Sequence, residues 1–489
     1  MRCEARKDAL SLVSTSSETD HRPIPTTAPR SVSAPAAERH GAAYGAALTD
    51  TALAEHAADV LRLNDMGGWT KAAPLLYPHQ WSWDSAFVAI GWAQVDVRRA
   101  TTEQQRLFEA QWRNGMVPQI VFNPDAGPES YFPDPARWAC ELSPEAPIGI
   151  AETSGLCQPP VHAIAVRRIL EVARELGGAE LADVRAQLVD LFPKLLAWHR
   201  YLAENRDPDG TGLVTTYHPW EGIDNSPRWD AVLARLEVGA VPPYTRRDVQ
   251  HVADAGQRPT NEHYDRFLWL LELLKRHRYD DAEIHLHYPF LVKDVFLTAV
   301  LVTANTALRE IAEFVGASDE DKALIELWRD RGRKGIASTV DTRSGMAYDL
   351  DMTTGAPIQV ATFAGMSPLI DGGFDAAQRA TSLALFDSPA FAGHPGLRWR
   401  MLPSTSPESE VFDPRNYWRG PVWPIVNWLY WQGLRDGGDV ERAEELRSAS
   451  LDALRTVGFA EYFDPMTGEP LGSAMQSWTA AVALDWLAS

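Results

Sequence analysis

The chain has 489 residues, of which 45% are hydrophobic, and its formal net charge is −20. This length and apolar content exclude a peptide, a disulfide-framed miniprotein and a disordered tail, and they suffice for one large domain or two to three ordinary ones. Asp and Glu outnumber Lys and Arg by 66 to 46. We therefore expect neither nucleic acid nor an anionic membrane as the main partner, because phosphate binding needs a basic surface.

Residues 1–45 differ from the rest of the chain. They are rich in Ser, Thr, Pro and Ala and show no hydrophobic periodicity. This composition predicts a disordered N-terminal extension, followed by one folded domain over residues 46–489.

From residue 50 onward, twelve segments show the apolar spacing of amphipathic helices or long runs of helix-forming residues. Strand-like alternation is scarce and short, as at residues 212–216. The helical segments are residues 50–64, 82–94, 101–113, 160–176, 180–204, 262–277, 290–314, 319–337, 373–386, 420–435, 439–457 and 475–488.

Twelve helices without βαβ alternation predict an all-α domain. An even number of antiparallel helices can close into a double ring, an (α/α)6 barrel. An α-solenoid is the alternative, although no repeat of fixed period is present. Long connections rich in Trp, Pro and Gly (residues 113–159, 206–261 and 387–419) are expected to carry the functional residues, since long loops in compact domains are usually functional.

The cysteine content and the hydropathy pattern indicate the compartment. Cys3, Cys140 and Cys157 form no CxxC pair, which fits a reducing environment and excludes a disulfide scaffold. The most apolar stretch, residues 295–308, is shorter than the roughly 18 residues of a membrane span, and the N-terminus lacks a secretory signal core. We therefore expect a cytoplasmic protein.

Motifs for phosphate or metal chemistry are absent from the sequence. There is no Walker loop, no HExxH and no GxSxG. Residues 207–212 begin like a calcium loop, but His218 occupies the twelfth position, where such a loop needs Glu, so we interpret the segment as a turn. We predict no metal and no cofactor.

The 18 Trp residues are roughly three times an average share. Core packing accounts for most of them in the simplest interpretation, because Trp is highly buried on average. The alternative is a carbohydrate site, where flat sugar faces stack on aromatic rings.

The densest mixture of aromatic and acidic residues is the loop Tyr217-His-Pro-Trp-Glu-Gly-Ile-Asp-Asn-Ser-Pro-Arg-Trp-Asp230. A carboxylate beside Trp on such a loop could be desolvated, which would raise its pKa and suit a general acid. A salt-bridged turn in which Asp224 caps a helix is the alternative. Spacing alone does not choose among Glu221, Asp224 and Asp230.

Three further clusters combine aromatic and polar residues. Residues 81–84 (WSWD) lead into a predicted helix, for which Asp84 could simply be the N-cap. Residues 417–423 (YWRGPVW) precede another helix. Residues 458–468 carry Glu461 on a loop, where a solvent-exposed acid is the alternative to a catalytic one.

Together these clusters resemble glycoside hydrolase family 63, in particular its bacterial glucosylglycerate and mannosylglycerate hydrolases. The similarity runs over residues 50–489. The motifs that carry it are AAPLLYPHQWSWDSAF (72–87), QWRNGMVPQIVF (111–122), YFPDPARWA (131–139), QPPVHAIAV (158–166), YHPWEGIDNSPRWD (217–230), RPTNEHYDRFLWLL (258–271), PSTSP (403–407), YWRGPVWP (417–424), FAEYFDPMTGEPLG (459–472) and QSWTAA (476–481).

This resemblance implies an (α/α)6 barrel whose long loops form a cap, and an inverting mechanism with Asp224 as general acid and Glu461 as general base. Inverting enzymes hold such carboxyl groups roughly 6.5–9.5 Å apart to leave room for water. For the sugar the resemblance implies Trp81, Asp84, Gln158, Trp220, Gly222, Arg258 and Trp423. For the glycerate it implies Tyr77, Tyr131, Trp418 and Gln476.

The implied reaction is hydrolysis of 2-O-(α-D-glucopyranosyl)-D-glycerate, a small glycoside. Mannosylglycerate hydrolysis, an α-glucosidase or trehalase-like activity on a neutral disaccharide, and non-catalytic sugar binding are the alternatives. Trp220-Glu-Gly-Ile-Asp224 is one residue shorter than the family pattern Trp-Glu-Ser-Gly-x-Asp, which puts the backbone contact at Gly222 and the substrate preference in question. The oligomeric state stays open, with a homo-oligomer as one option.

Overall fold

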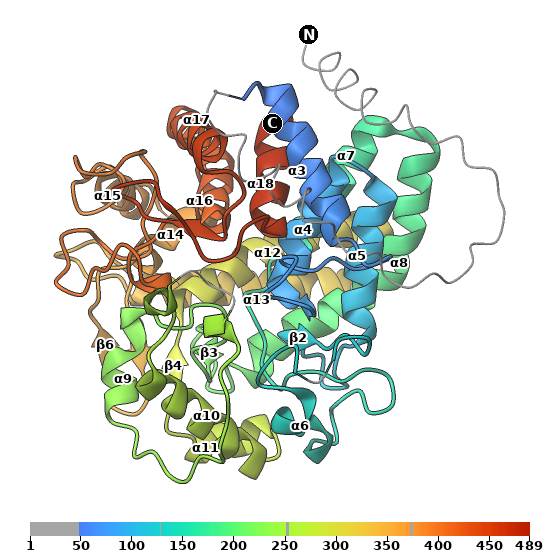
Figure 1. Cartoon of the computed structure of the whole chain (residues 1–489). Coiled ribbons are helices and arrows are strands. Elements are labelled where there is room, and N and C mark those ends of the chain that lie inside the picture. Colours follow the sequence, from blue (N-terminus) through green and yellow to red (C-terminus); the bar gives the residue numbers. More distant parts are fainter. Residues whose placement is uncertain (1–47, 128, 251–253, 372–374) are drawn as a thin grey trace.

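The computed structural model describes residues 48–127, 129–250, 254–371 and 375–489 (Figure 1). The predicted N-terminal extension, residues 1–45, lies outside the described residues. Its disorder, and the division of the chain at residue 46, therefore stay predictions.

Within the described part of the chain, twelve α-helices have eleven or more residues. They are α3 (Asp50–Asn64), α4 (Ser82–Ala93), α5 (Val97–Glu109), α7 (His162–Leu176), α8 (Gly178–Arg200), α10 (Asn261–Arg276), α12 (Val295–Val315), α13 (Asp319–Ser338), α15 (Ala376–Phe386), α16 (Pro424–Asp436), α17 (Val440–Val457) and α18 (Ser477–Ala488). Four shorter helices complete the set: α6 (Pro135–Trp138), α9 (Asp230–Ala234), α11 (Asp281–His287) and α14 (Pro368–Asp371).

Six helices form a closed inner ring. In ring order they are α4, α7, α12, α14, α16 and α18, and α18 packs against α4 to close the circle (Figure 1). The outer helices α3, α5, α8, α13, α15 and α17 alternate with them along the chain and pack on their outer faces. Because the inner helices are covered on all sides, α4, α12, α16 and α18 are almost entirely buried. The predicted (α/α)6 barrel is confirmed.

The prediction of twelve helices gave the right architecture with one wrong member. Residues 262–277 form α10, which lies outside the two rings; its buried face packs around Trp220 through Tyr264 and Phe267. The place in the inner ring that this helix was expected to fill belongs to the short helix α14, which sequence periodicity did not detect. Periodicity reports that one face of a helix is covered, but it does not report which element covers it.

Three helix starts differ from the prediction because of local capping. Helix α5 begins at Val97, where the Asp96 carboxylate accepts from the backbone N–H groups of Arg98 and Arg99 at 2.9 and 3.1 Å. Helix α12 begins at Val295 after a strand, with Asp294 as its N-cap. Helix α16 begins at its own first-turn proline, Pro424, a residue that is well suited to that position.

Of the described helices, only α12 is long and apolar enough to cross a membrane. The sequence analysis expected the apolar stretch to end at residue 308 and to be shorter than a membrane span. This expectation was wrong, because the helix has 21 residues. Most of the helix is buried in the inner ring, which is the environment of a core helix.

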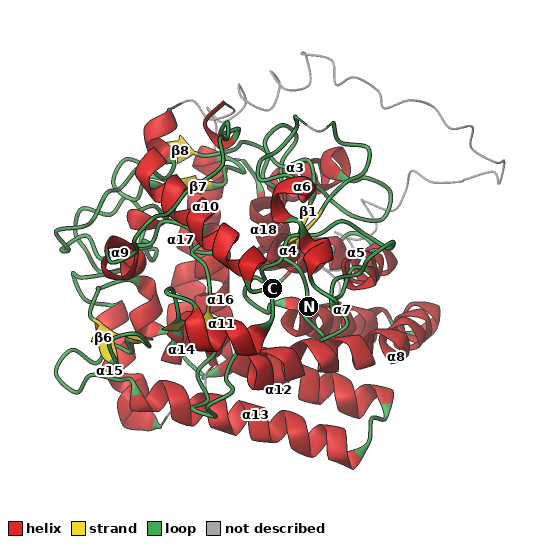
Figure 2. Cartoon of the chain, turned by 90° about the horizontal axis from the view of Figure 1, so that it is seen from below, coloured by secondary structure: helices red, strands yellow, loops and turns green. Residues whose placement is uncertain are grey.

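The described strands are short and form three antiparallel sheets (Figure 2). The largest has the order β3-β4-β5-β6, and the strand-like residues 212–216 of the sequence contribute β3 to it. The strands are β1 (Gln80–Trp81), β2 (Ile120–Val121), β3 (Thr215–Thr216), β4 (Val292–Lys293), β5 (Asp349–Asp351), β6 (Ala356–Ile358), β7 (Tyr462–Phe463) and β8 (Pro470–Leu471).

The segments between α5 and α7 and between α8 and α12 form a cap on the barrel. Figure 1 shows α6, α9, α10, α11 and the strands β3 and β4 together in its lower half, below the ring. The cap takes its chain from two of the long connections that the sequence singled out.

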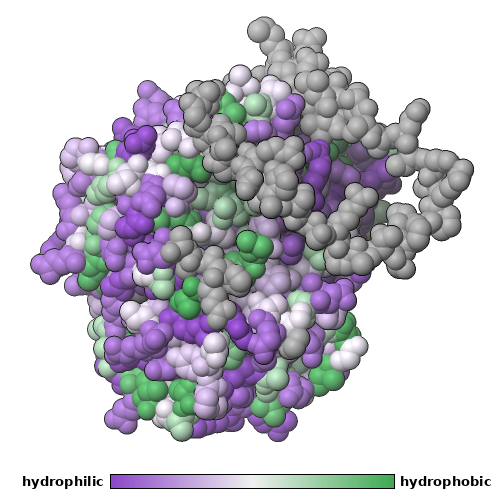
Figure 3. All heavy atoms as spheres, in the orientation of Figure 1, coloured by the Kyte–Doolittle hydropathy of each residue, from purple (hydrophilic) through white to green (hydrophobic). Residues whose placement is uncertain are grey.

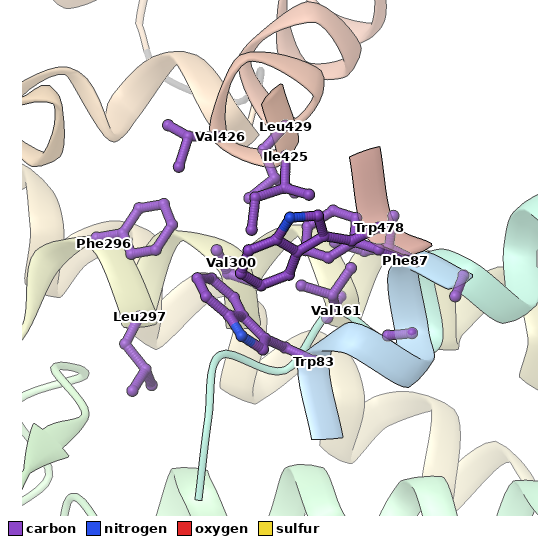
Figure 4. Close-up of a cluster of buried hydrophobic side chains, with 14 of the residues drawn as sticks. Trp83, Phe87, Val161, Phe296, Leu297, Val300, Ile425, Val426, Leu429 and Trp478 are labelled. Atoms are coloured by element: carbon purple, nitrogen blue, oxygen red, sulfur yellow. The ribbon is translucent and has the colours of Figure 1, made fainter. Parts of the chain in front are cut away.

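Side chains from the inner helices meet in the centre of the barrel. Figure 4 shows Trp83 and Phe87 of α4, Phe296 of α12, Leu429 of α16 and Trp478 of α18 converging there. On the outside, the face shown in Figure 3 is mostly hydrophilic, with hydrophobic side chains in small groups. The driving force for closing the ring is therefore burial of this aromatic and aliphatic centre.

We predict that Asp96→Ala lowers the free energy of unfolding by about 1 kcal/mol, because it leaves two N–H groups at the start of α5 without their acceptor. Chemical denaturation followed by Trp fluorescence measures the change. Asp96→Ser, which keeps a capping oxygen, is the control and should lose much less. Equal losses for the two variants would contradict a capping role.

Candidate active site

A cavity lies between the cap and one end of the barrel. It encloses about 830 Å³ of empty space, counted out to its open mouth. Asp84 lies in the first turn of α4, and Gln158, Trp418 and Gln476 come shortly before α7, α16 and α18. The floor of the cavity is therefore formed at the N-terminal ends of four of the six inner helices, and the cap supplies the opposite wall.

Twelve of the thirteen predicted site residues line this cavity. They are Tyr77, Trp81, Asp84, Tyr131, Gln158, Trp220, Gly222, Asp224, Arg258, Trp418, Glu461 and Gln476.

Trp423 is the exception, since it lies behind the cavity wall. Its indole stacks on that of Trp418 with ring centroids 3.8 Å apart and an interplanar angle of 0°. On its other side it stacks on Tyr462, and its Nε1 donates to the carbonyl of Tyr417 at 3.1 Å. Trp423 therefore supports the wall, whereas the resemblance had implied that it contacts the sugar.

The structure separates the three acids that spacing alone could not separate. Glu221 is buried in an ion pair with Arg206, and Asp230 pairs with Arg419 at 2.7 Å. Neither lines the cavity, whereas Asp224 does. The capping alternative for Asp224 was wrong, because the N-cap of the following short turn is Ser226.

The Asp224 carboxyl lies in an environment that favours its protonated form. Burial raises its pKa to about 7, and the carboxylates of Glu461 and Asp248 act in the same direction. The Arg258 guanidinium and a backbone hydrogen bond oppose this shift without cancelling it. A carboxyl group with such a pKa can hold a proton near neutral pH and release it to a substrate.

Glu461 lies among hydrogen-bond donors, and four of them surround its carboxylate. The hydroxyls of Tyr77 and Tyr417 donate to Oε1 at 2.8 and 3.4 Å. Arg258 Nη2 and the backbone N–H of Ser473 donate to Oε2 at 3.0 and 2.9 Å. Glu461 is 1% exposed, so the solvent-exposed alternative was wrong. The donors fix both oxygens of a group that can accept a proton from water.

Gly472 makes room for this arrangement. It has φ +70°, and a Cβ atom there would lie 2.5 Å from Oε2 of Glu461. The glycine closes the turn through which β8 brings the Ser473 N–H to the carboxylate. Any side chain at this position would displace Glu461.

Asp84 is the third carboxyl group in the cavity. It is 5% exposed, and burial and the charge of Glu461 hold its pKa well above its usual range. The N-cap of α4 is Trp81, so the capping alternative for Asp84 was wrong. A buried carboxyl group at the floor of the cavity suits hydrogen bonds with ligand hydroxyls.

Aromatic rings form much of the remaining wall. Trp81 contacts Tyr77 and Tyr131 edge-on, with ring centroids 5.1 and 5.2 Å apart. Gln119 Nε2 donates to the carbonyl of Trp220 at 2.7 Å and holds the loop that carries Asp224. Six Trp residues line the cavity and also belong to the buried core, so the two interpretations of the Trp content overlap: Trp81, Trp83, Trp138, Trp220, Trp418 and Trp478.

The shortened loop before Asp224 still reaches the cavity. Gly222 has φ +120°, and a Cβ atom there would lie 2.9 Å from Cδ of Pro159. The glycine therefore lets the backbone pass close to the segment that carries Gln158. Both Gly222 and Asp224 line the wall despite the missing residue.

Sequence reasoning missed several cavity residues: Trp83, Gln119, Trp138, Asp248, Tyr264, Tyr417 and Trp478. Most of them lie inside or beside the quoted motifs, so membership of a motif was the available signal. Five buried polar atoms of cavity residues have no partner among the described residues, namely Gln119 Oε1, Trp138 Nε1, Arg258 Nε, Gln476 Nε2 and Trp478 Nε1. Because buried polar atoms are nearly always paired, these atoms suit a ligand rich in hydroxyl groups.

Within the described ranges, no group of three or more His, Cys, Asp or Glu residues could hold a metal ion. In the calcium-like turn, the Lys293 ammonium group lies 2.7 Å from Asp207 Oδ1 and 2.6 Å from Asp209 Oδ1. A side-chain cation thus occupies the place between the carboxylates, as expected for a turn.

Known proteins resemble this chain over most of its length. Residues 77–479 match the family model described as "Mannosylglycerate hydrolase MGH1-like glycoside hydrolase domain". The chain is 48% identical over 441 residues to a glucosylglycerate hydrolase of Mycolicibacterium hassiacum, covering 90% of this chain and 98% of that protein. It is 43% identical to a mannosylglycerate hydrolase of Thermus thermophilus, with 88% and 99% covered.

The crystal structure of a GH63 mannosylglycerate hydrolase from Thermus thermophilus, in complex with Tris and D-glycerate, superposes with a TM-score of 0.80 at 42% identity. The superposition covers 89% of this chain and 99% of that one. The chain belongs to glycoside hydrolase family 63. It is therefore an enzyme that hydrolyses glycosidic bonds, and the family inferred from the sequence motifs is confirmed.

We predict that Gly472→Ala lowers glycoside hydrolysis on the order of 10²-fold, because the new methyl group displaces Glu461 and a misplacement of about 1 Å costs roughly that factor. Steady-state kinetics and a thermal melt measure activity and folding.

Gly355→Ala is the matched control. Gly355 has φ +69°, and a Cβ atom there would have no neighbour within 4 Å. The Gly355→Ala variant therefore introduces the same backbone strain without the clash. Its activity should stay near that of the unaltered enzyme. Equal activity of the two variants would contradict the role of Gly472.

Proposed function

We propose that this enzyme hydrolyses 2-O-(α-D-glucopyranosyl)-D-glycerate to glucose and D-glycerate with inversion at the anomeric carbon. The observation that carries the proposal is the pair of carboxyl groups in one cavity: Asp224, whose pKa is raised by burial, and Glu461, whose carboxylate accepts from four donors. The name of the Mycolicibacterium relative, a glucosylglycerate hydrolase, supports the substrate. A cavity bounded by the barrel on one side and by the cap on the other suits a small glycoside better than a polymer.

In the proposed mechanism Asp224 is the general acid. As the bond between the anomeric carbon and the glycerate oxygen breaks, its proton passes to that oxygen. Glu461 is the general base: it takes a proton from a water molecule whose oxygen attacks the anomeric carbon from the opposite face. The two carboxyl groups should lie roughly 6.5–9.5 Å apart, as in other inverting glycosidases.

The other cavity residues are proposed to bind the substrate. Asp84, Gln158 and Arg258 offer polar groups to the sugar hydroxyls, and Trp81 and Trp220 offer ring faces and exclude water. For the glycerate, Tyr77, Tyr131, Trp418 and Gln476 provide hydroxyl, indole and amide groups. These roles rest on the positions of the side chains on the cavity wall.

Mannosylglycerate is the second candidate substrate. The Thermus relative carries that name, and so does a relative in Selaginella moellendorffii that is 42% identical over 434 residues. Glucose and mannose differ only in the orientation of the 2-hydroxyl group, so the barrel and the proposed acid and base serve either sugar. A cytoplasmic location and a homo-oligomer stay predictions.

The deciding experiment is proton NMR of the enzyme with α-glucosylglycerate, α-mannosylglycerate and trehalose. We expect fastest cleavage of glucosylglycerate, with β-glucose as the first anomer formed. Asp224→Asn and Glu461→Gln should each lower turnover by orders of magnitude, roughly 10³-fold or more, while the thermal melt stays close to that of the unaltered enzyme. First-formed α-glucose would overturn the inverting mechanism, and faster cleavage of mannosylglycerate would change the substrate.

The pH dependence tests the acid separately. Asp224 has to be protonated to act as general acid, so kcat/KM should fall about tenfold per pH unit above the Asp224 pKa of about 7. The control is α-D-glucosyl fluoride, because fluoride leaves with little need for a proton. The fall should be much weaker with that substrate. If kcat/KM fell equally with both substrates above pH 7, the fall would have to be assigned to a group other than Asp224.

A further inference from the structure

We infer that the buried ion pair of Arg206 and Glu221 positions the loop that carries the general acid. The inference rests on the proposed role of Asp224. Neither Arg206 nor Glu221 lines the cavity, so both are positioning residues that act through the loop.

The Glu221 carboxylate accepts several hydrogen bonds on the side of the loop that faces away from the cavity. Its Oε2 accepts from Thr216 Oγ1 at 2.6 Å and from the backbone N–H of Tyr217 at 2.8 Å. Its Oε1 accepts from the backbone N–H of Cys157 at 3.4 Å. One side chain thereby joins its own loop to β3 and to the segment that carries Gln158.

Arg206 connects the Glu221 carboxylate to the barrel. Its Nη2 donates to both oxygens of Glu221, at 2.7 and 2.5 Å, and its Nε donates to the carbonyl of Thr215 at 2.9 Å. The guanidinium carbon lies 3.5 Å from the ring centroid of Tyr217. Arg206 directly follows the π-helical turn Tyr201–Asn205 at the end of α8, so an outer helix of the barrel anchors the loop.

Because Glu221 lies between cavity-lining residues in the chain, its anchoring also fixes the positions of those residues. Its two neighbours, Trp220 and Gly222, both line the wall, and Asp224 follows three residues later. The far end of the loop is held separately, because Trp229 Nε1 donates to the carbonyl of Ile223 at 2.7 Å. Residues 217–226 form neither helix nor strand and are held by turn hydrogen bonds, such as that from the Glu221 N–H to the carbonyl of His218, together with the side-chain anchors.

Positioning and plain stabilisation predict different results for an apolar replacement of the pair. Replacing both members of a buried ion pair with apolar residues of similar volume often leaves stability intact or improves it. Such a variant keeps the core packed but loses the hydrogen bonds that direct the loop. If the pair only stabilised the fold, this variant would be fully active.

The experiment uses two variants: the single variant Glu221→Gln, and a double variant that combines Arg206→Met and Glu221→Leu. Each is assayed on two substrates, α-glucosylglycerate and α-D-glucosyl fluoride. The first substrate requires proton transfer from Asp224, whereas the second requires little. We expect kcat on glucosylglycerate to fall on the order of 10²-fold in the double variant, with a fall below about threefold on the fluoride. The double variant should still melt cooperatively, with a lower melting temperature because Thr216 and the backbone N–H of Tyr217 lose their acceptor.

The pair of Arg168 and Asp485 supplies a matched control. It joins α7 to α18 away from the cavity, and Asp485 is likewise fully buried and accepts from several donors, including Trp428 Nε1 at 3.0 Å. Arg168→Met with Asp485→Leu should change kcat on the two substrates by the same small factor. A selective loss on glucosylglycerate in this control would show that the readout responds to general destabilisation, and the inference would fail.

Two further outcomes overturn the inference: full activity of the Arg206 and Glu221 double variant on glucosylglycerate, or equal losses on both substrates. Failure of the proposed function looks different. In that case Asp224→Asn itself keeps its turnover on glucosylglycerate, whatever the Glu221 variants do.

Discussion

The removal of carboxyl groups from water is the constraint on which the site depends. Asp84, Asp224 and Glu461 lie together in a cavity walled by aromatic rings, where an unpaired charge is costly. The protein resolves this cost differently for each group. Glu461 receives four donors, including the Arg258 guanidinium, while Asp224 and Asp84 have pKa values raised by burial. The proposed roles of Asp224 as proton donor and Glu461 as proton acceptor agree with this uneven supply of donors.

The barrel and the cap make different contributions to that arrangement. The inner helices bury a rigid aromatic centre, and Trp83 and Trp478 belong both to it and to the cavity wall. The floor therefore cannot shift without disturbing the core, because cores are close-packed. The cap contributes Asp224 and Arg258 from irregular segments. These segments depend on buried side-chain networks, such as the one around Glu221, to reach a defined position.

Acidic residues of the same loop thus have three separate tasks. Asp224 faces the cavity, Glu221 faces the barrel and pairs with Arg206, and Asp230 pairs with Arg419 away from the cavity lining. Residue type and spacing are nearly alike for all three. Burial, the partner and the direction of the side chain distinguish them, and these properties belong to the folded chain.

Amphipathic periodicity and the order of motifs determined the all-α class, eleven of the twelve barrel positions and the family, because these depend on local pattern along the chain. The motifs also determined which residues gather at the site, with Trp423 as the one displaced from its wall. Only the tertiary structure decided that α10 lies in the cap and that the short α14 completes the inner ring. It alone also showed that Glu461 is buried among donors and that Glu221 is hydrogen-bonded to Arg206, Thr216 and the backbone of Tyr217. The physical reason is that ring closure, desolvation and pairing depend on residues up to several hundred positions apart, such as Tyr77 and Glu461, which no local pattern connects.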